Sequence, residues 1–227
     1  MRWAYGMTTV PERDAGATLA SLADAGFPEP RLFVDGAKAP LPYPLEQTLR
    51  HPRVRCTGNW WLGLHELWVR DPCAEFYALF QDDLVAVRNI RPYMEARRVP
   101  ERCYFNLFSF PQNEELAPKG LTGWYLSNQR GRGAVALVFP HNAAEALLSA
   151  RHMVGKLTDL DRGFLNLDGG VITAMIQAGF RECCHAPSLV QHTGRVSTMG
   201  NRPHPQSGTY RDGDAMTFLE APRCSVM

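Results

Sequence analysis

The N-terminal segment constrains the fold most, because it predicts a strand, a helix and a second strand in direct succession. Residues 3–10 are an apolar run that Pro11 ends, residues 17–25 have helical composition, and residues 31–34 are apolar again before an Asp-Gly turn. Their combined length suits a crossover between two parallel strands. Parallel strands joined by a helix are typical of an α/β protein.

The rest of the chain continues this alternation and then becomes mixed. Further strands are predicted at residues 53–57, 76–80, 104–110, 133–139 and 188–192. Further helices are predicted at residues 60–69, 90–97, 142–153 and 169–179. The proline-rich residues 37–52 and the polar stretch beyond Gly194 are predicted to be loop. We therefore expect a single compact α/β domain with a mixed sheet flanked by helices.

The composition and charge are those of an ordinary folded domain. Of the 227 residues, 45% are hydrophobic, and 24 basic residues against 23 acidic ones give a net charge of +1. Disordered chains have fewer hydrophobic residues and a higher net charge, so this composition indicates a folded protein. The near balance of charge gives no global reason to expect nucleic acid or an anionic membrane as a partner, although arginines gather between residues 88 and 102.

The cysteines and the apolar runs bear on where the protein works. The six cysteines form no Cys-x-x-Cys pair, so we interpret them as free thiols in a reducing compartment. No secretory signal is visible, and the longest apolar run, near residues 134–140, is too short to span a bilayer. We expect a cytoplasmic protein without a membrane span.

The clearest sign of chemistry is the adjacent pair Asp82 and Asp83, which directly follows an apolar strand and Gln81. Ligands of open α/β sheets bind at the carboxyl ends of the strands. Two carboxylates there can hold a hard divalent cation, which would neutralise a diphosphate as it departs. The plainer interpretation is a polar strand exit in which one aspartate caps a turn.

Three further polar residues occupy comparable positions. Asp35 ends the second predicted strand and can accept hydrogen bonds from a ribose or a base, or simply form an Asp-Gly turn. His192 ends an apolar run and can offer an imidazole to a metal, or be a hydrogen-bonded loop histidine. Asp168 precedes a predicted helix and can act as a general base, as a helix cap, or as both.

The order of these features resembles the GT-A glycosyltransferase superfamily, whose core is a Rossmann-like sheet with a metal-binding Asp-x-Asp or Asp-Asp element. The likeness covers roughly residues 3–200, and the segment 187–194 is similar to the corresponding segment of the N-acetylglucosaminyltransferase IV family. We therefore predict a nucleotide-sugar-binding half at residues 1–103, an acceptor-binding and catalytic half at residues 104–200, and a polar tail or lid at residues 201–227.

The resemblance also implies roles for particular residues. It implies a donor site formed by Thr8, Thr9, Pro11, Arg13, Asp35, Asn59, Trp61 and Asp82. It implies that Asp83 and His192 bind the metal and that Asp168 is the catalytic base for the acceptor. The chain departs from the Glu-Asp motif of inverting members, because Leu167 precedes Asp168.

The function expected from these features is metal-dependent transfer of a sugar from a nucleotide-diphosphate sugar to an acceptor hydroxyl. A UDP-sugar donor is the common case in families of this type, and a candidate base favours inversion. Carboxylates suit magnesium and manganese, and the imidazole of His192 tilts the preference toward Mn²⁺. The acceptor is a glycan, a small molecule or a nucleic acid, and the sequence does not identify it.

Three alternatives stay open at this stage. The first is a glycosyltransferase that modifies a hydroxylated base in DNA, with the arginines between residues 88 and 102 tracking phosphates. The second is a nucleotide-sugar binding module without catalysis. The third is a metal-dependent hydrolase, because Asp-Asp pairs and histidine also occur in phosphatases.

Two regions extend the predicted site. Trp124 and Tyr125 lie between glycines and a polar run, so we expect them to be exposed and available to an acceptor sugar. Arg195, Arg202 and His204 in the C-terminal stretch can fold over a bound diphosphate as a lid, or belong to a solvated tail.

Overall fold

Four parallel strands form the first part of the sheet. The computed structural model describes residues 1–97, 99–158, 167–194 and 205–220. In it, β1 (Trp3–Thr9) pairs in parallel with both β2 (Arg31–Asp35) and β4 (Phe76–Gln81), and β3 (Gln47–Arg50) extends the array beyond β2. The carboxyl ends of these four strands therefore lie at one edge of the sheet.

The second part of the sheet is mixed. β8 (Ala136–Pro140) is antiparallel to β4 on one side and to β6 (Cys103–Asn106) on the other. β9 (Arg181–Ala186) is parallel to β6, and β7 (Gly123–Leu126) runs antiparallel to β9 at the edge. The strand order is β3-β2-β1-β4-β8-β6-β9-β7, which confirms the predicted α/β domain with a mixed, Rossmann-like sheet.

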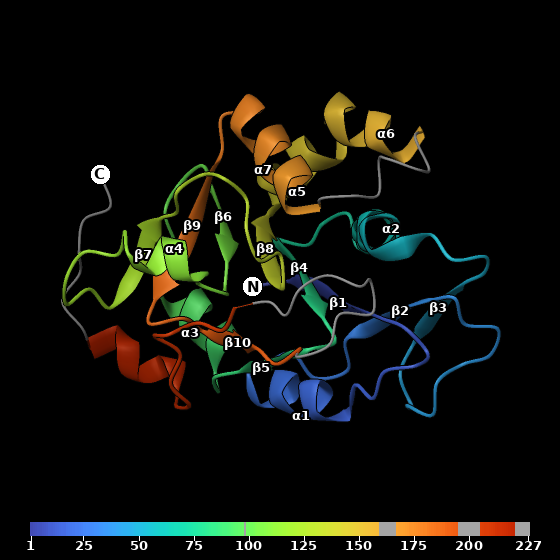
Figure 1. The fold of residues 1–227 in the computed structure, drawn as a ribbon, viewed down its shortest axis with the longest axis horizontal. Helices are drawn as coiled ribbons and strands as arrows, with labels where there is room; N and C mark the ends of the chain where they lie inside the picture. Colours follow the sequence, from blue (N-terminus) through green and yellow to red (C-terminus); the bar gives the residue numbers. More distant parts are fainter. Residues whose placement is uncertain (98, 159–166, 195–204, 221–227) are drawn as a thin grey trace.

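Helices cover both faces of the sheet (Figure 1). One face carries α2 (Arg55–Arg70), α5 (His141–Leu148) and α7 (Leu167–Gln177), with α6 (Arg151–Thr158) beside α7. The opposite face carries the two shorter helices α1 (Gly16–Asp24) and α3 (Ile90–Ala96). A four-residue helix, α4 (Pro111–Glu114), follows β6.

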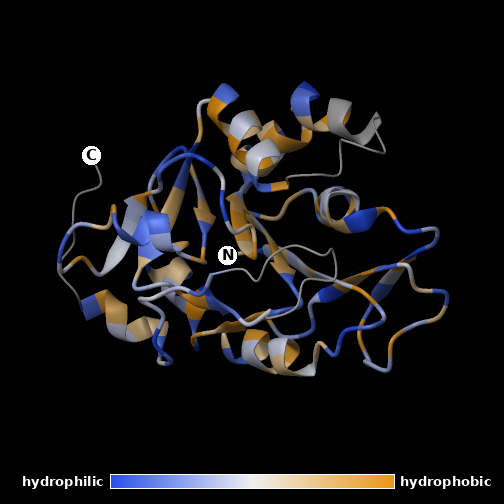
Figure 2. Cartoon of the chain, in the orientation of Figure 1, coloured by the Kyte–Doolittle hydropathy of each residue, from blue (hydrophilic) through white to orange (hydrophobic). Residues whose placement is uncertain are grey.

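Alternating side chains of the strands divide the core into two layers. On β2, Leu32 and Val34 pack in the layer that contains Leu22 of α1, whereas Phe33 points to the other face and packs with Trp61 of α2. Successive strand residues point to opposite faces, so a strand buried on both sides is almost continuously apolar. Figure 2 shows apolar residues concentrated on the strands and polar ones on the connecting loops.

A small second sheet connects distant parts of the chain. β5 (Leu84–Ala86) begins immediately after the aspartate pair and pairs antiparallel with β10 (Val190–His192). In this register Leu84 lies opposite His192. The pairing therefore brings His192 next to Asp83, which is more than a hundred residues earlier in the sequence.

The C-terminal part that the structure describes, residues 205–220, packs on the body of the domain. Arg88 forms an isolated bridge with Asp214, Ala215 is fully buried, and a 3-10 helix, η1 (Ala215–Glu220), lies against α3. Residues 205–220 are thus attached to the domain at these contacts, although many of their side chains are exposed. The proposed division of the domain into a donor half and an acceptor half stays a prediction.

Several predicted elements differ from the observed ones. The strand predicted at residues 53–57 is wrong, because α2 begins at Arg55. The helix predicted at residues 142–153 is divided into α5 and α6. The strands β3, β5, β7 and β9 were not predicted. None of the described helices is long and apolar enough to cross a membrane.

Candidate functional site

The carboxyl ends of β1 and β4 bring three charged side chains together. Thr8 of β1 lies opposite Gln81 of β4, so the loops that follow the two strands face each other. Arg13, in the loop after β1, donates from one guanidinium nitrogen, Nη1, to both aspartates that follow β4. Its distance is 2.5 Å to Asp82 Oδ1 and 2.7 Å to Asp83 Oδ2. The predicted donor-site arginine therefore bridges the predicted metal-binding pair.

Asp82 is the more deeply held of the two carboxylates. Its side chain is 6% exposed, and its Oδ2 accepts a hydrogen bond of 2.6 Å from Thr9 Oγ1. The main-chain oxygen of Asp82 accepts from Thr18 Oγ1 of α1. Burial raises the pKa of the Asp82 carboxyl, and the bonds from Thr9 and Arg13 only partly offset that effect. Thr9 thus holds the Asp82 carboxylate in place by a hydrogen bond.

The Asp83 carboxylate is positioned by contacts with two basic side chains, Arg13 and His192. Its Oδ2 lies 3.4 Å from His192 Nε2 in addition to its contact with Arg13. Burial raises the pKa of the Asp83 carboxyl, but His192 and Arg13 together outweigh burial and hold that pKa below its usual range. Within the described part of the chain, the buried Asp83 Oδ1 has no hydrogen-bond partner.

The segment after β10 packs directly on Asp83. Thr193 N donates to the main-chain oxygen of Asp83 at 2.8 Å. At Gly194, a side-chain carbon would lie 2.5 Å from Asp83 Oδ2 and 2.7 Å from His192 Cε1, so only glycine allows this close approach. The structure thus brings together Asp83 and His192, the predicted metal ligands, and Asp82, a predicted donor-site residue.

The donor set fits a divalent cation that takes few ligands from the protein. Carboxylate oxygens and an imidazole nitrogen are suitable ligands for Mn²⁺ or Mg²⁺, and the unpartnered Asp83 Oδ1 is an available lone-pair donor. Among the residues that the structure describes, however, no three His, Cys, Asp or Glu side chains are arranged to hold a metal ion. Phosphate oxygens and water would have to complete the coordination of any cation there.

Asp35 ties the end of β2 to the start of α2. Its buried Oδ1 accepts a 2.7 Å hydrogen bond from the main-chain nitrogen of Val54, the residue before the helix. Asn59 on α2 also makes bonds within the protein, from Nδ2 to Phe33 O and from Arg50 Nε to its Oδ1. Trp61 is 1% exposed inside the core. Asn59 and Trp61 are therefore committed to the fold, and we do not place them among the ligand contacts.

Cys56 is a residue at the site that sequence reasoning missed. It lies in the first turn of α2 and is partly buried. Burial is the main reason that the pKa of its thiol is raised to about 12. Negative charges of nearby carboxylates add to this effect; these belong to Asp168, Asp83, Asp82 and Asp35. The thiol is therefore protonated, and it lies within electrostatic reach of all four carboxylates that the sequence singled out. No sequence motif marks Cys56.

Asp168 lies at the start of α7 and contacts the loop before β8. Its Oδ2 accepts a 2.7 Å hydrogen bond from Gly133 N. Gly131 lies so close that a side-chain carbon would be 2.3 Å from the main-chain oxygen of Asp168, and its φ is +62°. Because β8 is antiparallel to β4, its amino end is at the same edge of the sheet as the aspartate pair. Asp168 therefore lies at the same edge of the sheet as Asp82 and Asp83, and its role as a base stays a prediction.

The expectation that Trp124 and Tyr125 are exposed is wrong. Both lie on β7 and are 4% exposed. The Trp124 ring packs against Phe105 and His185, and Tyr125 belongs to a small apolar cluster with Cys184. Their local sequence is polar, but the pairing of β7 with β9 turns them inward. We therefore do not assign them to an acceptor site.

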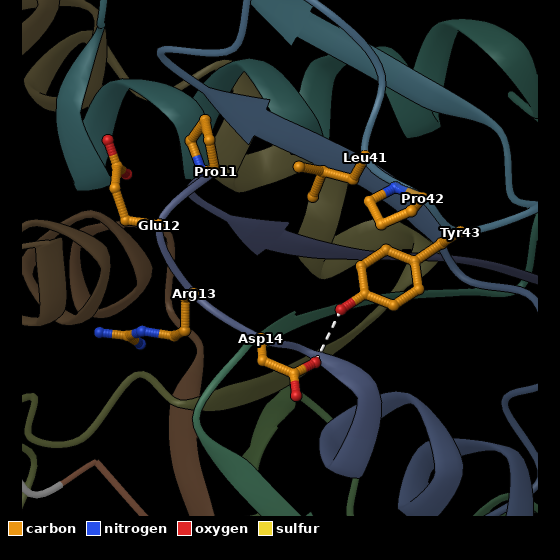
Figure 3. A pocket seen from close by; sticks show the side chains of 7 residues that line it. All are labelled: Pro11, Glu12, Arg13, Asp14, Leu41, Pro42 and Tyr43. Carbon is orange, nitrogen blue, oxygen red and sulfur yellow. Dashed lines mark hydrogen bonds between the residues drawn. The ribbon is translucent and has the colours of Figure 1, made fainter.

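A cavity of about 300 Å³ lies beside Arg13, between the loop after β1 and the loop after β2 (Figure 3). Its lining residues are Pro11, Glu12, Arg13, Asp14, Leu41, Pro42 and Tyr43. Asp14 Oδ1 accepts a 2.9 Å hydrogen bond from the Tyr43 hydroxyl, which fixes the ring at the cavity wall. Sequence reasoning treated residues 37–52 as plain loop and so missed Tyr43.

Some predicted residues lie outside the described part of the chain. These are Arg195, Arg202 and His204 of the proposed lid.

The fold has similarity to solved structures, but the sequence matches no known family. No protein-family model matches the chain, and no curated protein sequence matches it. The mannose-1-phosphate geranyltransferase from Thermus thermophilus has a similar fold, with a TM-score of 0.50 and 19% identity over 82% of this chain and 74% of that one. A CMP:2-keto-3-deoxy-manno-octonic acid synthetase complexed with CTP matches with a TM-score of 0.43 and 10% identity, over 81% of this chain and 89% of that one.

Proposed function

We propose that this protein is a divalent-cation-dependent transferase that acts on a nucleotide-diphosphate sugar. The observation that carries the proposal is the convergence of Arg13, Asp82, Asp83 and His192 at the carboxyl ends of β1 and β4, next to a cavity. Ligands of α/β sheets bind at this edge. The neighbouring fold belongs to an enzyme whose name includes a sugar phosphate, which is consistent with the proposal.

The cavity has the chemistry of a site for a nucleobase. The Tyr43 ring, Pro11 and Leu41 supply apolar surfaces on which a flat base can pack. The cavity adjoins Arg13, so a base bound there would have its phosphates close to the carboxylates and to a bound cation. We propose UDP as the nucleotide, following the common donor of the glycosyltransferases that the chain resembles.

The proposed transfer uses residues at the same edge of the sheet. Asp83 and His192 would hold Mn²⁺, or less favourably Mg²⁺, which would neutralise charge on the departing diphosphate. Asp168 would take the proton of the acceptor hydroxyl. The acceptor oxygen would bond to the anomeric carbon of the sugar while the bond from that carbon to the diphosphate oxygen breaks. A single displacement of this kind inverts the anomeric centre.

The contacts of the arginines between residues 88 and 102 favour a glycan or a small molecule over DNA as the acceptor. Two of these arginines make contacts within the protein: Arg91 pairs with Glu95, and Arg97 bonds to Tyr93 and to Phe218 O. Side chains used in this way do not form a free row for phosphates.

A second candidate function is nucleotidyl transfer, in which a sugar phosphate attacks a nucleoside triphosphate. The similarity of the fold to an enzyme named for mannose 1-phosphate favours it. The two reactions differ in the product, because nucleotidyl transfer releases pyrophosphate and glycosyl transfer releases a nucleoside diphosphate.

Thermal unfolding with nucleotides and Mn²⁺ tests the proposed function. A ligand at 100 times its Kd stabilises by about 2.7 kcal/mol, which for a chain of this size raises Tm by about 5–10 °C. We expect this rise with one nucleoside diphosphate or its sugar, and its loss in Asp83→Asn. The control variant Asp212→Asn changes an exposed aspartate away from these contacts and should retain the rise.

Product analysis then separates the candidates. Incubation of the nucleotide-diphosphate sugar with acceptor sugars should release nucleoside diphosphate, whereas incubation of the nucleoside triphosphate with sugar phosphates should release no pyrophosphate. The absence of any thermal shift with folded protein, over all nucleotides and both cations, would overturn the proposed function.

A further inference from the structure

The two carboxylates proposed to bind a cation already share a cation that belongs to the chain. Arg13 Nη1 lies 2.5 Å from Asp82 Oδ1 and 2.7 Å from Asp83 Oδ2, and the aspartate side chains are only 6% and 13% exposed. Two buried neighbouring carboxylates repel each other, and a bridging guanidinium removes most of that repulsion. Arg13 therefore stabilises the pair when no metal ion is bound.

The same carboxylate oxygen would serve both cations. Asp83 Oδ2 is the atom that faces Arg13 at 2.7 Å and His192 Nε2 at 3.4 Å. Asp83 can also offer its unpartnered Oδ1, but its contact with His192 is made by Oδ2. A divalent cation held between Asp83 and His192 would therefore take Oδ2, with or without Oδ1, and would also repel the guanidinium. Arg13 and the divalent cation therefore compete for one position.

The Arg13 side chain has an alternative position, toward the neighbouring cavity. This side chain is 21% exposed and borders the 300 Å³ cavity proposed for the nucleotide (Figure 3). Both of its bonds to the aspartates use Nη1, and within the described residues Nε and Nη2 make no hydrogen bond to the protein. A guanidinium released toward this cavity would meet the diphosphate of a ligand there, and phosphates are strong partners for arginine.

We propose that Arg13 is a displaceable internal counter-ion, which leaves the aspartate pair when a divalent cation binds and moves to the phosphates of the ligand. This inference rests on the proposed function for the identity of that ligand. Cation binding alone is weakened because it must break both contacts of Arg13. A nucleoside diphosphate strengthens cation binding because it supplies the new partner for Arg13, and linkage requires the cation to strengthen nucleotide binding by the same factor.

Manganese binding without nucleotide is the direct test, with free Mn²⁺ measured by electron paramagnetic resonance. Arg13→Gln removes the competing charge, and we expect it to bind Mn²⁺ about tenfold more tightly than the unchanged protein, within the roughly 5- to 150-fold range of couplings between sites. The matched control is Arg2→Gln, which removes an exposed Arg–Asp contact with Asp71 and should leave Mn²⁺ affinity unchanged. Equal or weaker Mn²⁺ binding by folded Arg13→Gln overturns the proposal.

A second variant covers the case in which Arg13→Gln does not fold. Arg13→Lys retains one charge but not the planar guanidinium, so it should hold the carboxylates less well and give a smaller gain in Mn²⁺ affinity. No gain overturns the proposal.

Nucleotide binding separates this proposal from the proposed function. If UDP binds but the Arg13 variants leave Mn²⁺ affinity unchanged, the counter-ion proposal fails and the proposed function stands. If the Arg13 variants gain Mn²⁺ affinity but no nucleotide binds, exchange at the aspartates is supported and the proposed function fails. If both hold, UDP should strengthen Mn²⁺ binding in the unchanged protein and much less in Arg13→Gln.

Discussion

At the scale of single residues, the protein holds acidic groups in the interior by different means. Asp82 and Asp83 share Arg13, whereas Glu182 on β9 is 2% exposed and relies on neutral donors. Its Oε1 accepts hydrogen bonds from Tyr104 Oη and Asn106 Nδ2, each at 3.3 Å. Burial, reinforced by the charge of Asp168, raises the pKa of the Glu182 carboxyl to about 7. Partners without charge thus leave the cost of burying the carboxylate largely uncompensated.

This raised pKa predicts a specific pH dependence of stability. The folded chain binds the proton of Glu182 more tightly than the unfolded chain, so the contribution of Glu182 to stability is fully present below the unfolded pKa of about 4.5 and is lost as the pH rises through about 7. The loss is on the order of 3 kcal/mol. Glu182→Gln should remove this part of the decline, measured by urea unfolding at pH 5 and pH 8. Glu145→Gln, at an exposed position on α5, should decline like the unchanged protein, and an identical decline in Glu182→Gln would contradict the assignment.

At the scale of elements, the position of α2 depends on two glycines that enclose Phe33. A side-chain carbon at Gly6 of β1 would lie 2.5 Å from Phe33 Cε2, and one at Gly63 of α2 would lie 2.8 Å from Phe33 Cδ2. The Phe33 ring is fully buried between them. The two glycines thus let the helix approach the sheet closely, and the start of that helix carries Cys56 and is bonded to Asp35.

Gly63→Ala should therefore destabilise the protein. Alanine favours a helix by about 1 kcal/mol over glycine, but overpacking of a core costs about 1–3 kcal/mol, and the buried ring has no open side to move into. We expect a net loss of about 1–2 kcal/mol in unfolding experiments. Gly213→Ala, where the nearest atom is 3.9 Å away, is the control. A Gly63→Ala/Phe33→Leu double variant should lose less than the sum of the single changes, and full additivity would argue against this contact.

At the scale of the whole molecule, Glu114 of α4 holds the C-terminal segment to the domain. Glu114 Oε1 accepts from Thr209 Oγ1 at 2.7 Å and from the Ser207 hydroxyl, and Oε2 accepts from Gly208 N at 3.0 Å. Gln191, next to His192, exchanges two hydrogen bonds with the main chain of Ser207. One carboxylate thus anchors residues 207–209 to α4.

Glu114→Gln should loosen this segment without unfolding the domain. The amide nitrogen of the introduced glutamine cannot accept a hydrogen bond. That nitrogen would face hydroxyl or main-chain donors that bond to a carboxylate oxygen in the unchanged protein. We expect amide hydrogen exchange at residues 207–210 to quicken by about tenfold, equal to about 1.4 kcal/mol, with β1 and β4 unchanged. The neighbouring exposed change Glu115→Gln should have no such effect. Uniform loss of protection in both regions would instead indicate a global role for Glu114.

Part of this organisation could be predicted from local sequence. β1, α1, β2, β4 and most of α2 follow from apolar runs and their punctuation, because each such pattern acts within a few neighbouring residues. The position of Asp82 and Asp83 after β4 follows from the same pattern and from the rule that ligands bind at strand ends. The α/β class, and the edge of the sheet at which the candidate residues gather, were thus determined by the sequence alone.

Only the tertiary structure decided how the site is assembled. The pairing of β5 with β10 brings His192 to Asp83, and the parallel pairing of β1 with β4 brings Arg13 onto both aspartates. The strands β3, β5, β7 and β9 are short or carry polar residues, so their pairing partners and not their own patterns specify them, and β7 buries Trp124 for that reason. Local patterns determine elements, whereas contacts between distant residues depend on the free energy of the whole packed sheet.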